Sequence, residues 1–490
     1  MENTPDRWRG NWAAGFEGSG AQAKVRYAAE VAPQGSWAGF LAALVVIAGC
    51  GSTGGAAPGQ GGTGGGVGGF AGSFTAAAGG SGSGAAAGAS GSGAAAGGSG
   101  TGGAAADSGS GGAAGSGTAA GGAGGVVSSR PFDMNDVTIL APLPRSTATP
   151  VLLRATDLAD DNTPLVPRVL FDQVARDRNS TTGAALPLLD MPYERLQLVA
   201  VRFDLCDRHQ PGPCPDAEDA RMRLVFQPLT DAPTSARDIG FHAFYAIRND
   251  EIPGALGLLR ELAMMAPAQP GPLRVSPALS ASDPEPYASK LRAFVRRYGG
   301  EARLARLTMN AQDLQSEAFA WVLQGIEKQA GAFVDMPIVG ATQLAQRVIL
   351  GSAANYDVVP VIDQPPGFRS TLSQAVFDRA DATQKPQLLA ALAAVENPLS
   401  QTSETVACVT CHVSTVVMAT RASAAAIDPL ALPGRYTSTF DLSIAGGQST
   451  STPQTLRALG YFRTVPLISQ RVVNETAQTL TEIAQRFPGP

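Results

Sequence analysis

Apolar and polar residues alternate along several stretches in the middle of the chain. Residues 195–206 read RLQLVAVRFDLC and residues 221–229 read RMRLVFQPL, with apolar side chains recurring at every second position. A period of two over this length is typical of β-strands. The apolar stretch 239–247, which contains His242, predicts another strand. We expect further strands at 137–140, 302–309, 318–326 and 344–350.

Other stretches have helical signals. Residues 286–298 follow Asp283-Pro284 and end at Gly299-Gly300, a common start and stop for a helix. We expect further helices at 252–265, 388–395, 403–424 and 469–487. The last of these carries one apolar stripe at helical spacing, formed by Val473, Ala477, Leu480, Ile483 and Phe487.

These patterns predict an α+β protein with a clear division along the chain. We expect a mostly antiparallel β domain with a few helices at 130–380, followed by a small helical segment at 381–490. Together they hold about 360 residues, enough for one large domain or two ordinary ones.

Residues 51–129 have neither kind of pattern. They are rich in Gly, Ala and Ser, and Asp107 is their one charged residue. Such a stretch buries too little apolar surface to offset its conformational entropy. We therefore expect a disordered linker, with a root-mean-square span of roughly 50 Å.

An apolar segment precedes this linker. Residues 37–49 read WAGFLAALVVIAG, which is too short for a membrane-spanning helix but fits the core of a signal peptide. The following Ile47-Ala48-Gly49-Cys50 resembles the lipobox of bacterial lipoproteins. This resemblance implies a signal peptide at 1–50 and lipidation of Cys50, and Gly51 after that cysteine favours the outer membrane. The alternative is a free cysteine that ends a buried helix.

The start of the chain departs from the lipoprotein pattern. Residues 1–24 include Glu2, Asp6 and Glu17, whereas the first part of a signal peptide is normally short and basic. We therefore interpret residues 1–24 as an extension upstream of the true start.

Charge argues against several classes of partner. The net charge is -5 and the sequence pI is about 5.4, so nothing marks a nucleic-acid interface or an anionic membrane surface. We expect contact with the membrane only through the N-terminal lipid. The sequence also lacks a P-loop and the G-x-S-x-G and H-E-x-x-H motifs.

Two of the five cysteines flank a loop between predicted strands. Cys206 and Cys214 enclose a turn that contains Pro211, Gly212 and Pro213. In an exported protein this arrangement predicts a disulfide. A zinc site formed by Cys206, His209 and Cys214 is the alternative, although no fourth ligand lies nearby.

Cys408-Val409-Thr410-Cys411-His412 is a C-x-x-C-H motif. Its spacing places two thiols and an imidazole on one side of a helical turn, where the thiols can add to two haem vinyl groups and the imidazole can bind the iron. The motif and its helical surroundings resemble c-type cytochromes, which implies one covalent haem c, with His412 as the proximal ligand. The alternatives are a zinc site and a redox dithiol, but no second C-x-x-C completes tetrahedral zinc.

The sixth ligand of such an iron is not evident from the sequence. Common monohaem cytochromes c use a methionine downstream of the motif, and here Met418 is the last methionine. It lies six residues after His412 on the same helix, about 9 Å along the axis, and cannot easily reach the opposite face of the haem. His242 is most simply a buried, hydrogen-bonded histidine. The remaining candidates are water, His242, His209, Met264, Met265, Met309, Met336 and Tyr461.

The sequence therefore favours a lipid-anchored monohaem c-type cytochrome that transfers single electrons to a redox partner protein. It would be an outer-membrane lipoprotein of the cell envelope, facing the periplasm or the cell surface. One alternative is a haem enzyme, or a protein that binds gas or peroxide at an open distal site. The other is a surface-binding or structural lipoprotein in which the haem is auxiliary.

Overall fold

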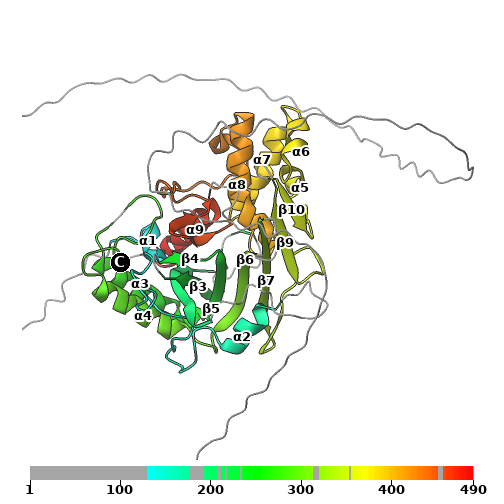
Figure 1. The fold of residues 1–490 in the computed structure, drawn as a ribbon. Coiled ribbons are helices and arrows are strands. Elements are labelled where there is room, and N and C mark those ends of the chain that lie inside the picture. The colour runs from blue at the N-terminus through cyan, green and yellow to red at the C-terminus, as the bar shows by residue number, and fades with distance from the viewer. Residues whose placement is uncertain are drawn as a thin grey trace, which may run out of the picture. The chain divides into compact units, whose positions relative to one another are not determined.

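The strands follow one another as a long antiparallel meander (Figure 1). The computed structural model describes residues 130–176, 193–206, 211–212, 214–215, 218–231, 234–268, 270–312, 319–351, 355–450 and 456–488. These residues form a ten-stranded sheet in the order β1-β2-β3-β5-β6-β7-β9-β10, with β4 paired to β3 and β8 to β7. The strands are β1 Thr138–Leu140, β2 Leu196–Asp204, β3 Ala220–Thr230, β4 Ser235–Ala236, β5 Ile239–Ile247, β6 Leu304–Gln312, β7 Phe319–Gln329, β8 Ala332–Asp335, β9 Ala345–Leu350 and β10 Tyr356–Val359.

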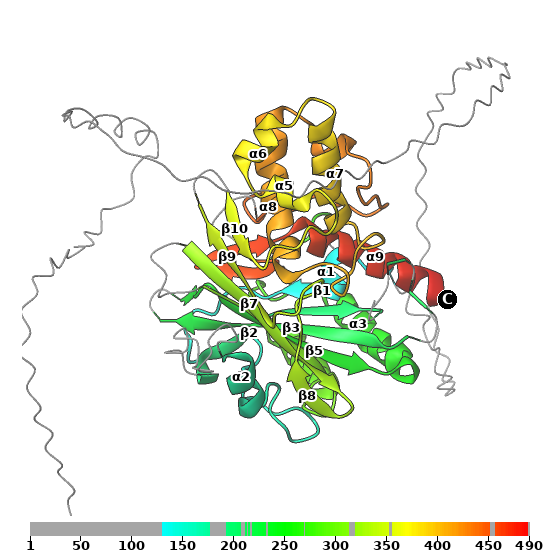
Figure 2. The same cartoon turned by 90° about the vertical axis from the view of Figure 1, so that its right-hand side faces the viewer.

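Helices and a short hairpin complete the described part of the chain. The hairpin pairs β11 Leu459–Phe462 with β12 Val465–Ile468. The helices are α1 Met134–Val137, α2 Arg168–Val174, α3 Ile252–Met265, α4 Glu285–Tyr298, α5 Phe368–Thr371, α6 Gln374–Arg379, α7 Gln384–Glu396, α8 Cys408–Ala425 and α9 Gln470–Arg486. Both views place α5–α8 on one side of the sheet and α2 on the other (Figures 1 and 2).

The predicted strands and helices are confirmed, with small differences at their ends. The strand at 239–247 and the helix at 252–265 have the predicted bounds. The helix expected at 403–424 begins at Cys408 instead, because residues 403–407 form turns. The overall prediction of a mostly antiparallel β fold with several helices is correct.

Two apolar clusters hold the fold together. The larger cluster joins β1–β6 to α3, α4 and α9. The smaller one joins β7, β9 and β10 to α5–α8, with Trp321 and Phe377 fully buried within it. Because β6 and β7 are neighbours, the two clusters share one sheet.

The C-terminal helix belongs to the core of the sheet. The apolar stripe of α9 is buried in the cluster of β1–β6, and the hydroxyls of Thr138 and Thr476 lie 2.7 Å apart. The described residues of 130–380 and of 381–490 therefore lie within one compact unit. The predicted small cytochrome-like segment is not confirmed, and its last helix packs with the sheet.

Several predictions fall outside the described residues. They are the signal peptide at 1–50 with Cys50, the linker at 51–129, and His209. Among the helices in the described ranges, none combines the length and hydrophobicity needed to cross a bilayer.

Cys206 and Cys214 form a disulfide at the end of the β2–β3 pair, as predicted. The alternative of a zinc site also requires His209, which lies outside the described residues.

Removing this disulfide should lower stability. The bond closes a loop with a sequence separation of 8, so we expect Cys206→Ser with Cys214→Ser to lower the free energy of unfolding by about 2–3 kcal/mol. Urea unfolding in oxidising buffer measures this difference, and a reductant should destabilise the native chain but not the variant. Equal stability of the two proteins without reductant would contradict the prediction.

Candidate functional site

A pocket lies between the sheet and the start of α8. It has about 840 Å³ of empty space, part of it open to solvent. Helix α8 contributes Cys408, Cys411 and His412 to its lining, and the start of α9 contributes Arg471 and Val472. The sheet contributes His242 and Phe244 from β5, and Thr308 and Asn310 from β6. The structure therefore brings the whole C-x-x-C-H motif to one pocket.

The packing of α8 orients the motif. Val409, Val413 and Val416 are fully buried in the smaller apolar cluster, which fixes the rotation of the helix about its axis. Residues at i, i+3 and i+4 share a helix face, so Cys408, Cys411 and His412 turn together toward the pocket. Both thiols are free and half-buried, and burial, followed by the nearby Cys411, raises the pKa of Cys408 to about 11.

The imidazole of His412 is held by a backbone carbonyl. Its Nδ1 donates to the Leu456 carbonyl oxygen at 2.6 Å, and Asn310 Nδ2 donates to the same oxygen at 2.9 Å. With the proton on Nδ1, Nε2 keeps its lone pair, which is the usual arrangement of a metal-binding histidine. Burial, helped by the charge of Arg457, lowers the pKa of His412 to about 4, so the ring is neutral at pH 7.

His242 faces His412 across the pocket. It lies on β5 between Val225 of β3 and Thr308 of β6, and its ring centre is 6.4 Å from that of His412. Burial lowers the pKa of His242 well below its usual value, and His412 and Arg223 add to this effect. The expected hydrogen bond is not found, because no described residue donates to the His242 ring or accepts from it.

The structure separates most of the other candidate sixth ligands from the pocket. Met264 and Met265 are exposed at the end of α3. The Tyr461 hydroxyl donates to the Ala141 carbonyl oxygen at 2.7 Å, inside the core of the sheet. Met418 is buried in the smaller cluster and does not line this pocket.

Two methionines do border the pocket, but they differ in direction. Met309 lies between Thr308 and Asn310 on β6, and alternation along the strand turns its side chain to the opposite face, into the larger cluster. Met336 lies on the pocket side, with its Cε 3.2 Å from the point where a Cβ on Gly325 would lie. The structure therefore keeps His242 and Met336 as candidate ligands.

Arginines surround one end of the pocket. The guanidinium carbons of Arg221, Arg223 and Arg306 lie 5.9, 4.8 and 5.9 Å from the centre of the Phe244 ring. Burial, followed by the charge of Arg306, lowers the pKa of Arg221 to about 9. Carboxylates of the chain already pair with two of these arginines, Glu404 with Arg306 and Asp204 with Arg223. Sequence analysis missed this cluster, although two arginines at alternate positions of an apolar strand were a signal.

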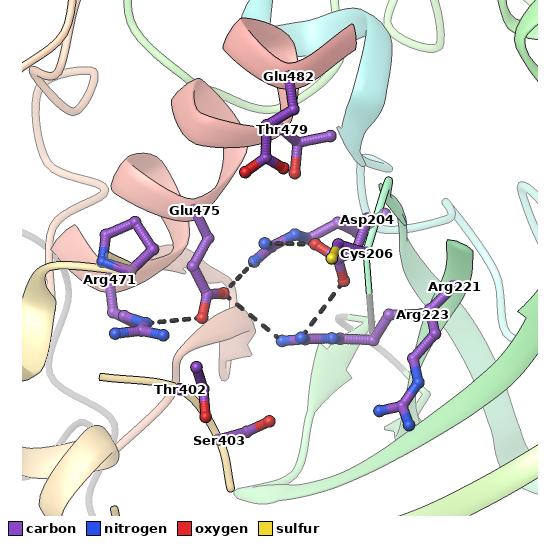
Figure 3. Close-up of a pocket in the computed structure, with 12 residues that line it drawn as sticks. Asp204, Cys206, Arg221, Arg223, Thr402, Ser403, Arg471, Glu475, Thr479 and Glu482 are labelled. Carbon is purple, nitrogen blue, oxygen red and sulfur yellow. Dashed lines mark hydrogen bonds and ion pairs between the residues drawn. The ribbon is translucent and has the colours of Figure 1, made fainter. Parts of the chain in front are cut away.

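Glu475 of α9 connects this end of the pocket to the sheet. It forms ion pairs with Arg202, Arg223 and Arg471, and Arg202 also pairs with Asp204 (Figure 3). The side chain of Arg202 is 2% exposed and that of Glu475 is 15% exposed. Burial alone would raise the pKa of Glu475, but the charges of Arg471 and Arg202 lower it far below its usual value.

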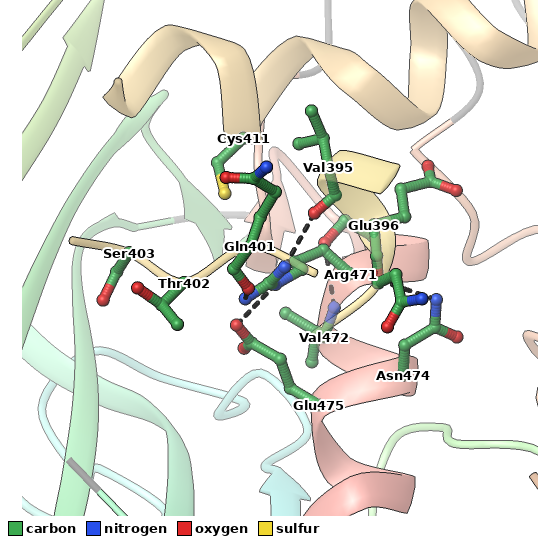
Figure 4. Close-up of polar contacts among 12 residues, drawn as sticks. Val395, Glu396, Gln401, Thr402, Ser403, Cys411, Arg471, Val472, Asn474 and Glu475 are labelled. Carbon is green, nitrogen blue, oxygen red and sulfur yellow. Dashed lines mark hydrogen bonds and ion pairs between the residues drawn. The ribbon is translucent and has the colours of Figure 1, made fainter. Parts of the chain in front are cut away.

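Arg471 also ties α9 to the segment before the motif. It donates to the carbonyl oxygens of Val395 at 2.7 Å and Gln401 at 2.8 Å (Figure 4). Asn474 Nδ2 donates to the Glu396 carbonyl oxygen at 2.9 Å. These contacts fix the end of α7 close to the pocket wall.

The Glu396 carboxyl should make stability fall as pH rises. Its burial raises its pKa to about 7, above the unfolded value, so the folded chain binds the extra proton between about pH 4.5 and 7. Stability is therefore fully present below this window and declines through it, by up to about 3 kcal/mol. We expect Glu396→Gln to reduce the change in the free energy of unfolding between pH 5 and 8, as measured by urea unfolding. At pH 8 the variant should be more stable than the native protein. An unchanged slope in the variant would assign the pH dependence to another group.

The ligand atoms of the motif do not converge on a single point. Among the described residues, Cys206, Cys214 and Glu218 form a group whose possible ligand atoms lie within 4.8 Å of one another, although the two sulfurs are joined in the disulfide. Cys408, Cys411 and His412 form no such group, whereas zinc needs ligands about 2.0–2.3 Å from one ion.

The arrangement therefore presents two free thiols and one neutral imidazole to a single pocket, with cationic side chains at one end. The chain matches no protein-family model, no curated protein and no solved structure.

Proposed function

We propose that this protein is a monohaem c-type cytochrome that transfers single electrons in the cell envelope. One observation carries the proposal: both thiols of the motif and the imidazole of His412 line the same pocket, and Leu456 holds that imidazole with its Nε2 lone pair free. The spread of these three groups supports haem over a single metal ion.

Each residue has a defined role in this proposal. Cys408 and Cys411 would hold the haem covalently through their thiols. His412 would bind the iron through Nε2, and Asn310 and the Leu456 carbonyl oxygen would keep its ring oriented. Arg223 and Arg306 line the pocket and, besides their ion pairs with Asp204 and Glu404, would add positive charge near the propionate carboxylates. When bound, haem supplies an iron that gains and loses one electron.

We also propose that Cys50 anchors the chain to the outer membrane through lipid, with 51–129 as a flexible linker. The disulfide Cys206–Cys214 supports an oxidising compartment. Labelling cells with a radioactive fatty acid tests the anchor: the native chain should be labelled and Cys50→Ser should not. Equal labelling of both would place the lipid elsewhere.

Expression of the full chain with a c-type maturation system tests the haem proposal. We expect haem to stay with the polypeptide through acid-acetone extraction and on a denaturing gel, at one haem per chain, with the sharp reduced α-band of haem c. Protein that is folded and free of haem, or that carries zinc in its place, would overturn the proposal.

A further inference from the structure

We propose that His242 of β5 is the second axial ligand of the haem iron, so that the iron is held between two imidazoles. This inference rests on the proposed function and names the ligand on the distal face of the haem. It assigns the ligand that the C-terminal sequence does not supply.

The spacing of the two rings carries the inference. Their centres are 6.4 Å apart and their planes are inclined by 70°. Two imidazoles on opposite sides of one metal ion, with metal–nitrogen bonds of about 2.0 Å, have their ring centres about 6–6.5 Å apart. The inclination is compatible, because an imidazole can rotate about its bond to a metal without losing that bond.

The surroundings of His242 also favour a ligand. Its side chain is 8% exposed and lines the pocket, and no hydrogen bond to its ring occurs among the described residues. Coordination of a metal would satisfy one ring nitrogen, so the pocket supplies a reason for an imidazole at this position of an apolar strand.

The position of His242 is fixed on both sides. Hydrogen-bonded strands flank β5, with Val225 opposite His242 on β3 and Thr308 opposite it on β6. A rigid strand places a ligand more reproducibly than a loop does. Met336, the competing donor, lies outside these strands, after the end of β8, and packs over Gly325.

Two strong protein ligands would leave no open position on the iron. Such a centre transfers electrons and does not activate oxygen or peroxide. Two nitrogen ligands also favour a lower reduction potential than the histidine–methionine pair of common cytochromes c. The inference therefore selects electron transfer over the haem-enzyme alternative.

Spectroscopy of the holoprotein tests the inference. We expect the native protein to be low-spin in both oxidation states and not to bind CO rapidly. His242→Ala should keep its covalent haem on a denaturing gel, become high-spin, and bind CO rapidly. Added imidazole should restore the low-spin spectrum of this variant, which shows that its pocket is folded.

Matched methionine variants provide the control. Met336→Leu and Met418→Leu should both keep the native spectrum. A high-spin Met336→Leu protein together with an unchanged His242→Ala protein would overturn the inference in favour of Met336. A native protein that is already high-spin and binds CO would overturn it in favour of an open site. Both outcomes leave covalent haem on the gel, whereas failure of the proposed function removes it.

Discussion

The double substitution Cys408→Ala and Cys411→Ala is expected to abolish haem staining of the polypeptide on a denaturing gel. The two thiols are the proposed attachment points on the pocket wall, and no other described free cysteine can replace them. Alanine has the highest helix propensity, so the first turn of α8 should still form. Each single variant should keep one thioether bond and therefore part of the stain.

A matched pair of variants makes this result specific. Cys206→Ser with Cys214→Ser also removes two cysteines, but from the disulfide at the end of β2 and β3, and it should keep the full stain. Covalent haem that persisted in the Cys408→Ala, Cys411→Ala protein would disprove the assigned attachment. Loss of stain in both double variants would instead indicate a general failure of maturation.

Glu475→Gln is expected to lower the free energy of unfolding by about 3–5 kcal/mol at pH 7. The carboxylate pairs with Arg202, Arg223 and Arg471, and the substitution leaves buried guanidinium groups with less negative charge. Removing one partner from a buried ion network costs far more than the network itself contributes. Urea unfolding of the full chain measures the loss.

The effect of Glu475→Gln should depend on pH. The folded-state pKa of Glu475 is lowered, so this carboxyl contributes stability that is present above its unfolded pKa of about 4.5 and is lost as pH falls below that value. The difference between native and variant proteins should therefore shrink in acid. A difference that stayed constant down to pH 3 would contradict this origin.

An exposed ion pair of the same spacing is the control. Arg168 and Asp172 are also four residues apart on one helix, but their side chains are 58% and 49% exposed. Exposed pairs contribute about 1 kcal/mol or less. We therefore expect Asp172→Asn to be nearly neutral. A similar loss in both variants would show that burial does not set the effect.

Much of the secondary structure could be predicted because its causes are local. The period of two in 195–206 and 221–229 and the apolar stripe of 469–487 depend only on which face each residue occupies. The places where the elements pack could not be predicted in this way. The stripe of α9 fits a core helix of any kind, and only the structure shows that its partner is the sheet, with Thr476 beside Thr138.

Some residues of the candidate site could likewise be identified from the sequence, and others could not. The C-x-x-C-H spacing is local chemistry, so Cys408, Cys411 and His412 could be identified from the sequence. His242 could not be separated from an ordinary buried histidine, since its position depends on the β5–β6 register and on the docking of α8. Asn310 and the Leu456 carbonyl had no sequence signal at all, because their contacts with His412 join distant parts of the chain.

The contact between Thr138 and Thr476 has a consequence for folding kinetics. It joins segments separated by 338 residues, and folds that depend on such distant contacts form slowly, because the chain must first close long loops. Arg471 and Val472 of α9 complete the pocket wall, so this wall forms late, after most of the chain has been synthesised. Until α9 docks, the wall of the pocket that Cys408 and Cys411 line lacks Arg471 and Val472.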